Sequence, residues 1–482
     1  MCRHGDPRNS IRAHRSLINK CDANWFAVAE HNSLDRTILN NPGTPLQRDA
    51  RSIIGTELFE VAQSYLAHEG IAVNMSVLTT DIEPPTLGLH AIENYEPLVG
   101  RETTERILKK SKALQNSHFV HISSTFYGGG VTEILTPLTL LMNAMGIETG
   151  WRMIQGTPSF FNCTKKLHNA LQGDASALTP EEKAVYEQVT RENAMRLHID
   201  DCDAVIVHDP QPLPLVNHLK KENACWIWQC HVDLSSPNSS AWDYLRDFIE
   251  RYDTAVFSLP EYKQGLRIPQ RFITPAINPF SPKNCELTTQ QVAECLAFHR
   301  IPTDLPIVAQ ISRFDRWKDP EGVIEAFRRA REQVDCRLVL LGNNAVDDPE
   351  AGIILETIQS SVDERIFVLT VDDPLLVNAL QRQAAVVLQK STREGFGLTV
   401  TEAMWKGAAV IGGNVGGIRR QIRDGHNGFL VSSIEEAADR IVLLIRDASL
   451  REKLGARAKD TVRGHFLLSH LVEDWIDLLS SH

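Results

Sequence analysis

The sequence predicts an α/β protein with two domains, each built around a parallel sheet that is covered on both faces. The chain has 482 residues, which is more than one ordinary core encloses. From about residue 92, short apolar runs alternate with helical stretches in both halves, as in successive β-α units. These runs contain few polar residues, which suits strands with helices on either side.

The domain boundaries are expected where this alternation is interrupted. The stretch "TPAINPFSPKNCEL", residues 274–287, breaks both the helical and the strand periodicity with prolines, asparagines and a serine. We therefore predict a first domain over residues 92–285 and a second over residues 286–465. Apolar residues at helical spacing predict that residues 466–482 form a helix packing across the two domains.

Residues 1–91 differ from the rest and are predicted to be an extension that is partly disordered or accessory. Within it, residues 50–70 have a helical pattern and residues 71–79 read as a strand. The turn-rich "DIEPPTLG" follows. This extension is not needed for the β-α pattern of the two domains.

Eight apolar runs are the predicted strands of the two sheets. In the first half they are residues 118–123, 204–208 and 224–229; in the second half they are residues 306–312, 337–342, 365–370, 384–389 and 408–413. Ligands of open parallel sheets bind outside the carboxyl ends of the strands. The residues that directly follow each run are therefore the candidates for a site.

Composition limits the class of ligand. A formal net charge of -11 without a long basic run argues against nucleic acid or an anionic membrane as partner. Nine scattered cysteines without a C-x-x-C pair favour a reduced compartment, and no apolar window reaches the roughly 18 residues of a membrane span. We expect a cytoplasmic protein that binds a small polar ligand.

Glycines and histidines follow the strands of the first half. Gly128, Gly129 and Gly130 come between a strand and an apolar helix, where backbone amides and the helix dipole suit an anion. His208 with Asp209, and His231 with Asp233, follow the next two predicted strands. The alternative for the glycines is a flexible turn, and the alternative for the histidines is a structural role. Cys225 and Cys230 near His231 supply no fourth zinc ligand, so no metal site is predicted.

Two cations follow the first strand of the second half. Arg313 and Lys318 lie in a loop that is expected to open a helix at Asp319-Pro320. Cations beside a helix N-terminus can hold a diphosphate without a metal ion. A solvated basic turn is the alternative interpretation.

The stretch "STREGFGLTVTEAMWKG", residues 391–407, contains two glutamates that could suggest a glycosidase. Gly395 and Gly397 predict a loop that holds Glu394, whereas Glu402 falls on the following helix. In a continuous helix, eight residues would separate the two by about 12 Å. Because paired glycosidase carboxylates lie roughly 5 to 9.5 Å apart, we favour recognition of two parts of one long ligand.

Together these motifs resemble a known family. Glu394 and Glu402, with Arg313 and Lys318 in an R-x4-K arrangement and the triple glycine, are similar to the retaining glycosyltransferases of family 4, which have the GT-B fold. The phrases "STFYGGGVTEIL", "FFNCTKKLHNALQG", "HDPQPLPL" and "WQCHVDLS" resemble, within that family, the enzymes that form trehalose. The resemblance runs from about residue 92 to the C-terminus and implies two Rossmann-like domains facing a central cleft.

The resemblance implies a role for each candidate residue. The catalytic set would be Glu394, His231, Arg313 and Lys318; the donor-binding set Gly129, Gly130, Arg313, Lys318, Gly395, Phe396, Gly397, Leu398 and Glu402; and the acceptor-binding set Gly128, Phe160, Phe161, His208, Asp209 and Asp233. Arg313 and Lys318 would hold the donor diphosphate, and Glu402 the ribose. Glu394 and His231 would contact the transferred glucose.

The implied activity is a reversible, retaining transfer of glucose from ADP-, UDP- or GDP-glucose to glucose, giving trehalose. No cofactor and no essential Mg²⁺ are implied, and a homodimer is plausible by resemblance alone. Because both glutamates serve binding, we favour attack on the same face as the leaving group over a carboxylate nucleophile. The alternatives are trehalose phosphorylase, a nucleotide-sugar epimerase and a non-catalytic sugar-nucleotide-binding protein.

Overall fold

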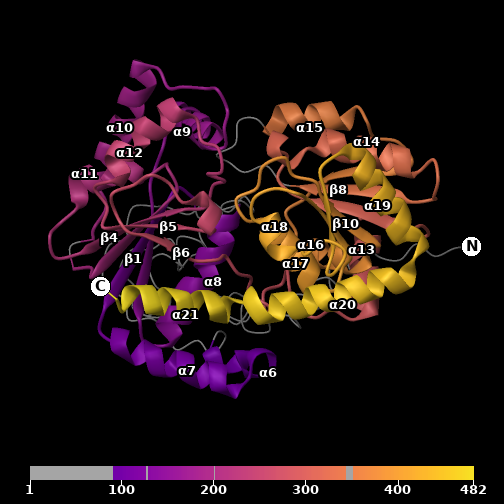
Figure 1. Ribbon diagram of the computed structural model, residues 1–482, viewed down its shortest axis with the longest axis horizontal. Coiled ribbons are helices and arrows are strands. Elements are labelled where there is room, and N and C mark those ends of the chain that lie inside the picture. Colours follow the sequence, from indigo (N-terminus) through magenta and orange to yellow (C-terminus); the bar gives the residue numbers. More distant parts are fainter. Residues whose placement is uncertain (1–90, 126–128, 200, 343–350, 482) are drawn as a thin grey trace, which may run out of the picture.

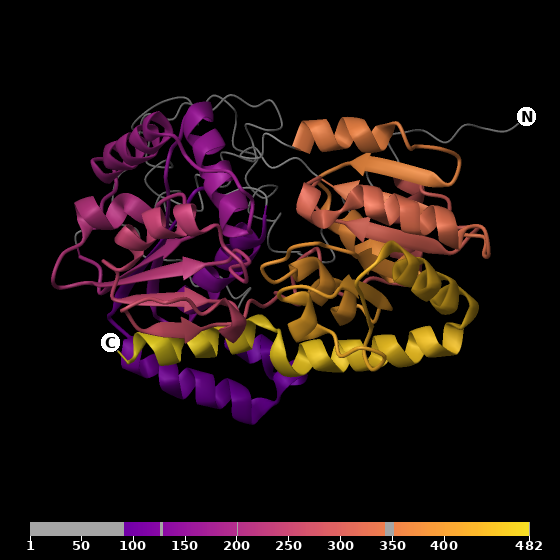
Figure 2. The same ribbon diagram turned by 45° about the horizontal axis from the view of Figure 1, so that its top comes forward.

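The computed structural model describes residues 91–125, 129–199, 201–342 and 351–481. The helix and strand predicted at residues 50–79, like the rest of the N-terminal extension, lie outside the described residues. The described chain forms two α/β domains, each with one six-stranded sheet between two layers of helices (Figures 1 and 2). Two apolar cores flank each sheet, one on either face.

The first sheet has the strand order β2-β1-β3-β4-β5-β6, and every pair is parallel. Its strands are β1 (His118–Ser123), β2 (Glu148–Met153), β3 (Ala204–His208), β4 (Cys225–Cys230), β5 (Thr254–Phe257) and β6 (Gln270–Phe272). From β1 the chain adds β2 on one side, and from β3 it adds β4, β5 and β6 on the other, so the strand order reverses between β1 and β3. In such a sheet a crevice opens between those two strands at their carboxyl ends.

The second sheet has the order β12-β11-β10-β7-β8-β9, again all parallel. Its strands are β7 (Ile307–Ile311), β8 (Arg337–Gly342), β9 (Ile366–Thr370), β10 (Val386–Gln389), β11 (Val410–Gly413) and β12 (Phe429–Val431). This is the dinucleotide-binding order, which reverses between the first and fourth strands. Its crevice therefore lies between β7 and β10.

Helices cover both faces of the two sheets. In the first domain they are α6 (Glu96–Val99), α7 (Arg101–Ser111), α8 (Gly130–Ala144), α9 (Pro158–Leu171), α10 (Pro180–Ala194), α11 (Val216–Leu219) and α12 (Ser239–Ile249). In the second they are α13 (Thr289–Phe298), α14 (Pro320–Ala330), α15 (Ala351–Gln359), α16 (Pro374–Gln383), α17 (Leu398–Trp405), α18 (Ile418–Gln421), α19 (Ile434–Arg446) and α20 (Ala448–His465). No helix in the described part of the chain is long and apolar enough to span a membrane.

The eight predicted strands are all present, with ends within two residues of those expected. The four that sequence patterns missed are β2, β5, β6 and β12. Strand β2, "ETGWRM", alternates in burial because it lies at a sheet edge, and β6 and β12 have only three residues each. The longest apolar runs were recognisable because they occupy the doubly covered centre of each sheet.

The chain passes between the domains twice, at adjacent places. After β6 it enters the second domain near Ile277, and after α20 it returns near Leu467. The two crossings are paired: Ile277 N donates to Phe466 O over 2.9 Å, and Leu468 N donates to Ile277 O over 2.9 Å. The last helix, α21 (Leu468–Leu479), then packs on α7 and α8 of the first domain (Figure 1).

Candidate active site

Both crevices open into one cavity of about 470 Å³ between the two domains. Its walls come from the segments that follow β1, β3 and β4 in the first domain and β7 and β10 in the second. The two sheets thus point their carboxyl ends at the same space. This is where small ligands bind in open parallel sheets.

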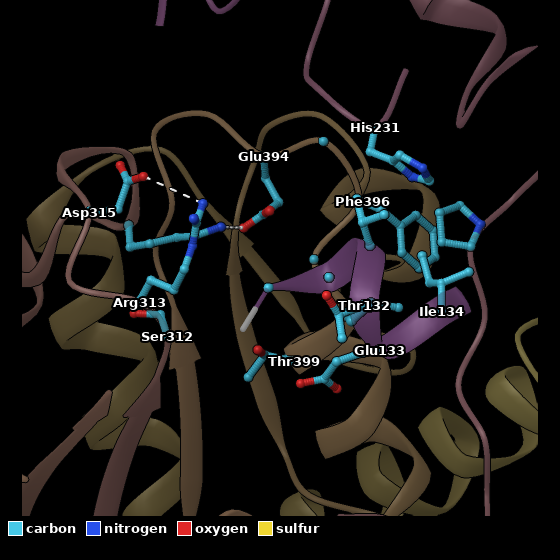
Figure 3. A pocket seen from close by; sticks show the side chains of 18 of the residues that line it. Thr132, Glu133, Ile134, His231, Ser312, Arg313, Asp315, Glu394, Phe396 and Thr399 are labelled. Atoms are coloured by element: carbon cyan, nitrogen blue, oxygen red, sulfur yellow. Dashed lines mark hydrogen bonds and ion pairs between the residues drawn. The ribbon is translucent and has the colours of Figure 1, made fainter. Parts of the chain in front are cut away.

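Arg313 and Lys318 lie on the second-domain wall, in the loop between β7 and α14. Between them, buried Asp315 lies 3.8 Å from an Arg313 guanidinium nitrogen and 3.3 Å from the Lys165 ammonium (Figure 3). Burial alone would raise the pKa of Asp315, but the three cations outweigh it and lower the pKa to about 2. One carboxylate therefore anchors a group of three cations, and a net positive charge remains for an anionic ligand.

Glu394 faces these cations from the loop after β10 (Figure 3). Its carboxylate accepts hydrogen bonds from Lys318 Nζ over 2.6 Å and Ser391 Oγ over 3.0 Å, and the residue is 8% exposed. Charge-assisted hydrogen bonds of this kind hold a carboxylate in a fixed orientation. Lys318 thus contacts Glu394 and also lines the cavity.

The Glu394 loop is fixed by close backbone contacts. A Cβ on Gly416 would lie 1.8 Å from Glu394 O, and one on Gly417 would lie 2.3 Å from the Phe396 Cα. Gly417 N donates to Glu394 O over 3.2 Å. The glycines after β11 are therefore required for the loop to lie at this depth. Gly395, Phe396 and Gly397 line the cavity just before α17 begins.

The same loop contacts the first domain directly. A Cβ on Gly395 would lie 1.9 Å from His231 O, so only glycine permits this approach. Tyr262 of the first domain donates its hydroxyl hydrogen to the Glu394 and Gly395 carbonyl oxygens, which lie 2.9 and 3.0 Å away. The loop that carries Glu394 is thus positioned by both domains.

Glu402 lies on α17 at the side of the cavity nearest the domain crossings. It is 3% exposed, and Lys283 lies 3.9 Å from its carboxylate while forming an ion pair with Glu133 of α8. Burial raises the pKa of Glu402 to about 7, although Lys283 opposes that effect. The two glutamates of the E-x7-E motif therefore have separate partners, Lys318 for Glu394 and Lys283 for Glu402.

The first-domain wall carries the glycine turn and two histidines. Gly129 has a φ of 98°, which favours glycine, and Gly130 begins α8. His231 lines the cavity beside Phe396 (Figure 3). His208 also lines it, but its Nε2 bonds to His121 over 2.9 Å and its Nδ1 to His231 over 3.0 Å.

The cavity brings together most of the predicted site residues. These are Gly129, Gly130, His208, Asp209, His231, Arg313, Lys318, Glu394, Gly395, Phe396, Gly397, Leu398 and Glu402. Gly128 lies outside the described residues.

Three predicted acceptor residues do not line the cavity: Phe160, Phe161 and Asp233. Phe160 is fully buried and stacks on Tyr186 in the first-domain core, with Phe161 against it. Asp233 instead caps its own loop, because its Oδ1 accepts a hydrogen bond from Ser235 N over 2.9 Å. In each case an apolar or turn-forming role accounts for the residue.

Sequence reasoning missed Lys165 and His168, one turn apart on α9, and Lys283 at the domain crossing. Burial and the surrounding cations lower the pKa of His168 to about 3, so this ring lines the cavity in its neutral form. Lys165 and His168 fall within "FFNCTKKLHNALQG", where their spacing of i and i+3, which places both on one face of a helix, was the available signal. Lys283 had no such signal, because it lies in an irregular segment.

Further contacts join the domains at the mouth of the cavity. Trp317 Nε1 donates to Asn169 Oδ1 over 3.1 Å, and Arg316 pairs with Asp174 at 2.7 Å. Within the described ranges, no group of three or more His, Cys, Asp and Glu side chains is placed to hold a metal ion.

Comparison with known proteins agrees with this geometry. Residues 121–264 match the family model of the trehalose synthase N-terminal domain, and residues 293–461 match that of glycosyl transferases group 1. The chain is 42% identical to the trehalose synthase of Pyrococcus horikoshii over 403 residues, which cover 82% of this chain and 97% of that protein. The chain belongs to the trehalose synthase family.

Membership in the trehalose synthase family makes the chain a hexosyltransferase with the GT-B fold. A more distant relative is the trehalose phosphorylase of Pleurotus sajor-caju, at 26% identity over 78% of this chain and 59% of that protein. Among solved structures, α,α-trehalose 6-phosphate synthase from Burkholderia multivorans aligns with a TM-score of 0.61 and 16% identity, over 76% of this chain and 98% of that one. At that identity the likeness supports the fold alone.

Proposed function

We propose that the chain transfers glucose from a nucleoside-diphosphate glucose to glucose, reversibly and with retention of configuration, to give trehalose. The observation that carries this proposal is that Arg313, Lys318 and Glu394 meet at the crevice of the second sheet, facing His231 across the cavity. This arrangement suits a ligand with a diphosphate at one end and a sugar at the other. The 42% identity to a trehalose synthase favours glucose as acceptor.

In the donor half, Arg313 and Lys318 bind the diphosphate. Negative charge grows on the departing nucleoside diphosphate as the bond to the anomeric carbon breaks. The two cations and the amides at the start of α17 stabilise that charge, and one such contact contributes about 3 kcal/mol to the transition state. Asp315 supports them by fixing the position of Arg313 without neutralising the whole group.

Glu394 binds hydroxyl groups of the donor glucose. Its carboxylate already accepts from Lys318 and Ser391, and its remaining lone pairs are available to sugar hydroxyls. Because Lys318 contacts both Glu394 and the diphosphate, it couples the two ends of the bond that breaks. Glu402, at the other end of the cavity, accepts from the ribose hydroxyls.

The acceptor hydroxyl attacks on the face from which the diphosphate leaves. The bond between the acceptor oxygen and the anomeric carbon forms, the bond to the diphosphate oxygen breaks, and a phosphate oxygen takes the acceptor proton. This order follows if Glu394 stays engaged by Lys318 and Ser391 and does not act as a nucleophile. Isolation of a glucosyl ester on any carboxylate of the chain would overturn it.

Acceptor glucose lies against the first domain, near Gly129, Gly130 and Asp209. His231 contacts the transferred sugar from the same side. His208 was predicted to touch the acceptor, but with both of its ring nitrogens bonded to histidines we assign it a different role below. The cations replace a metal ion at the diphosphate, so Mg²⁺ is proposed to be dispensable.

The test uses the purified full chain with glucose and each of ADP-, UDP- and GDP-glucose, analysed for trehalose and nucleoside diphosphate. A parallel mixture contains trehalose and phosphate, analysed for glucose 1-phosphate. Trehalose in equal amount to the nucleoside diphosphate is the expected result. Glucose 1-phosphate from the second mixture alone would make the chain a phosphorylase, and no product from either would refute the proposal.

A further inference from the structure

Three histidines form a connected row through the first domain. His121 lies within β1, His208 ends β3, and His231 follows the end of β4. The register pairs His121 with Ile206 and His208 with Gln229, so each histidine lies two residues further along than the one before. Since side chains two apart in a strand share a face, the three rings lie diagonally on one face of the sheet.

The rings are joined by hydrogen bonds. His121 Nδ1 lies 2.9 Å from His208 Nε2, and His208 Nδ1 lies 3.0 Å from His231 Nε2. His208 also stacks on His231, with ring centroids 5.3 Å apart. Burial lowers the pKa of all three imidazoles, that of His121 to about 3, so the row is neutral.

A neutral row has few arrangements of its hydrogens. Each bond needs one N–H and one lone pair, and His208 has one of each. Choosing the tautomer of one ring therefore determines the other two. Among the described residues none bonds to His231 Nδ1, the ring atom left for a ligand, and its role as donor or acceptor is set by the two rings behind it.

The inner end of the row is closed by the C-terminal helix. His121 is fully buried, its Nε2 has no hydrogen-bond partner in the described chain, and its ring lies edge to face with Trp475 of α21 at 5.7 Å. At the outer end, His231 N donates to Asp209 Oδ1 over 2.7 Å, which fixes the backbone. The row thus runs across three neighbouring strands on one face of the sheet, from α21 to the cavity.

We propose that His208 and His121 are positioning residues for glycosyl transfer, which keep the His231 ring in one orientation and one tautomer toward the donor sugar. The effect on glycosyl transfer rests on the proposed function, whereas the fixed tautomer of His231 does not. It explains why two histidines that a ligand barely reaches are placed in a core where an apolar residue would otherwise pack. Their effect on turnover passes through His231.

Two substitutions separate the two links of the row. In His208→Gln the side-chain amide reaches the former Nε2 position and keeps the bond to His121, but the bond to His231 is lost. In His208→Asn the amide reaches the former Nδ1 position, next to His231, and the bond to His121 is lost. Exposed His198, which is remote from the cavity lining, provides the control His198→Asn.

We expect kcat to fall at least about tenfold in His208→Gln, because a misplaced catalytic contact costs that much or more. His208→Asn should fall less, and the KM for donor should change little in either. Wild-type kcat in both His208 variants, with wild-type thermal unfolding, would overturn the inference while leaving the proposed function intact.

A second measurement needs no substrate. In protein labelled with nitrogen-15 histidine, each ring of the row should show one protonated and one bare nitrogen between about pH 6 and pH 8, the His231 signals being assigned by loss in His231→Asn. In His208→Gln the two His231 signals should move toward an average. Averaged His231 signals already in the wild type would refute a fixed tautomer, whatever the enzyme turns out to transfer.

Discussion

The two crevices of this molecule are built by one topological rule but carry opposite chemistry. Between β7 and β10 the second domain presents Arg313, Lys318 and Glu394, which forms an ion pair with Lys318. Between β1 and β3 the first domain presents glycine amides and neutral imidazoles. The second-domain side, the charged wall, suits an anionic group, and Lys165 of the first domain completes its group of cations. The first-domain crevice between β1 and β3 suits neutral groups such as sugar hydroxyls.

The largest effect is expected from breaking the charged wall. Arg313→Ala and Glu394→Ala should each lower kcat at least about 100-fold, the scale for loss of a transition-state contact. Steady-state kinetics with the best donor is the measurement. Exposed Arg328 on α14 offers the control Arg328→Ala. Near-normal turnover in both Arg313→Ala and Glu394→Ala would refute a role of the charged wall in catalysis.

The next effect tests whether the two walls must touch. Gly395→Ala places a Cβ against His231 O and should push the Glu394 loop away from the first domain. We expect a loss of about tenfold or more in kcat, because small displacements of reacting groups are costly. The control is Gly464→Ala, where a Cβ meets no atom within 4 Å; equal kcat for the two variants would contradict the need for this contact.

A smaller effect concerns pH and Glu402. Its folded-state pKa of about 7 exceeds the ordinary 4.5, so its contribution to stability is full below pH 4.5 and is lost as the pH rises through 7. Glu402→Gln removes this dependence. From pH 5 to pH 8 the free energy of unfolding of wild type should therefore fall relative to the variant by on the order of 2 kcal/mol.

Urea unfolding at the two pH values measures that difference. The exposed Glu452 on α20 supplies the control Glu452→Gln, which should track the wild type at both pH values. If Glu402→Gln also tracks the wild type, the carboxyl is ionised throughout this range.

The smallest effect is expected from metal removal. Since protein cations hold the diphosphate in the proposed reaction, excess EDTA should change kcat by less than about twofold. Dialysis against EDTA followed by readdition of Mg²⁺ is the measurement. A large loss that Mg²⁺ restores would show that the charged wall is incomplete as described.

The position of the charged wall in the cavity could be predicted from sequence because its residues are charged and follow apolar strands. Arg313, Lys318 and Glu394 have no apolar side chain that would pack in a core instead. Phe160 and Phe161 illustrate the converse: their phrase resembles the family, but Phe160 fills the core and half-buried Phe161 packs against it. The two parallel sheets were predicted correctly because unbroken apolar strands dominate the centre of both, whereas the GT-B fold was implied by the resemblance of the motifs to a known family.

What sequence could not predict depends on register and on distant contacts. The row from His121 to His231 follows from strand alignment, which no local pattern encodes. Lys283 meets Glu133 and Glu402 only because the domain crossing brings them together. Lys165 joins Asp315 from the opposite domain, 150 residues away in sequence.

The paired crossings at Ile277 and Leu467 mean that the first domain is built from two separate segments of the chain, with the second domain between them. The segment from near residue 277 to near residue 467 is an insert, and the final helix belongs to the body that precedes it. A chimera that exchanges the second domain between relatives would therefore need two junctions, one near each crossing. With a single junction, α21 would come from the other protein, and the residue that packs against His121 would change with it.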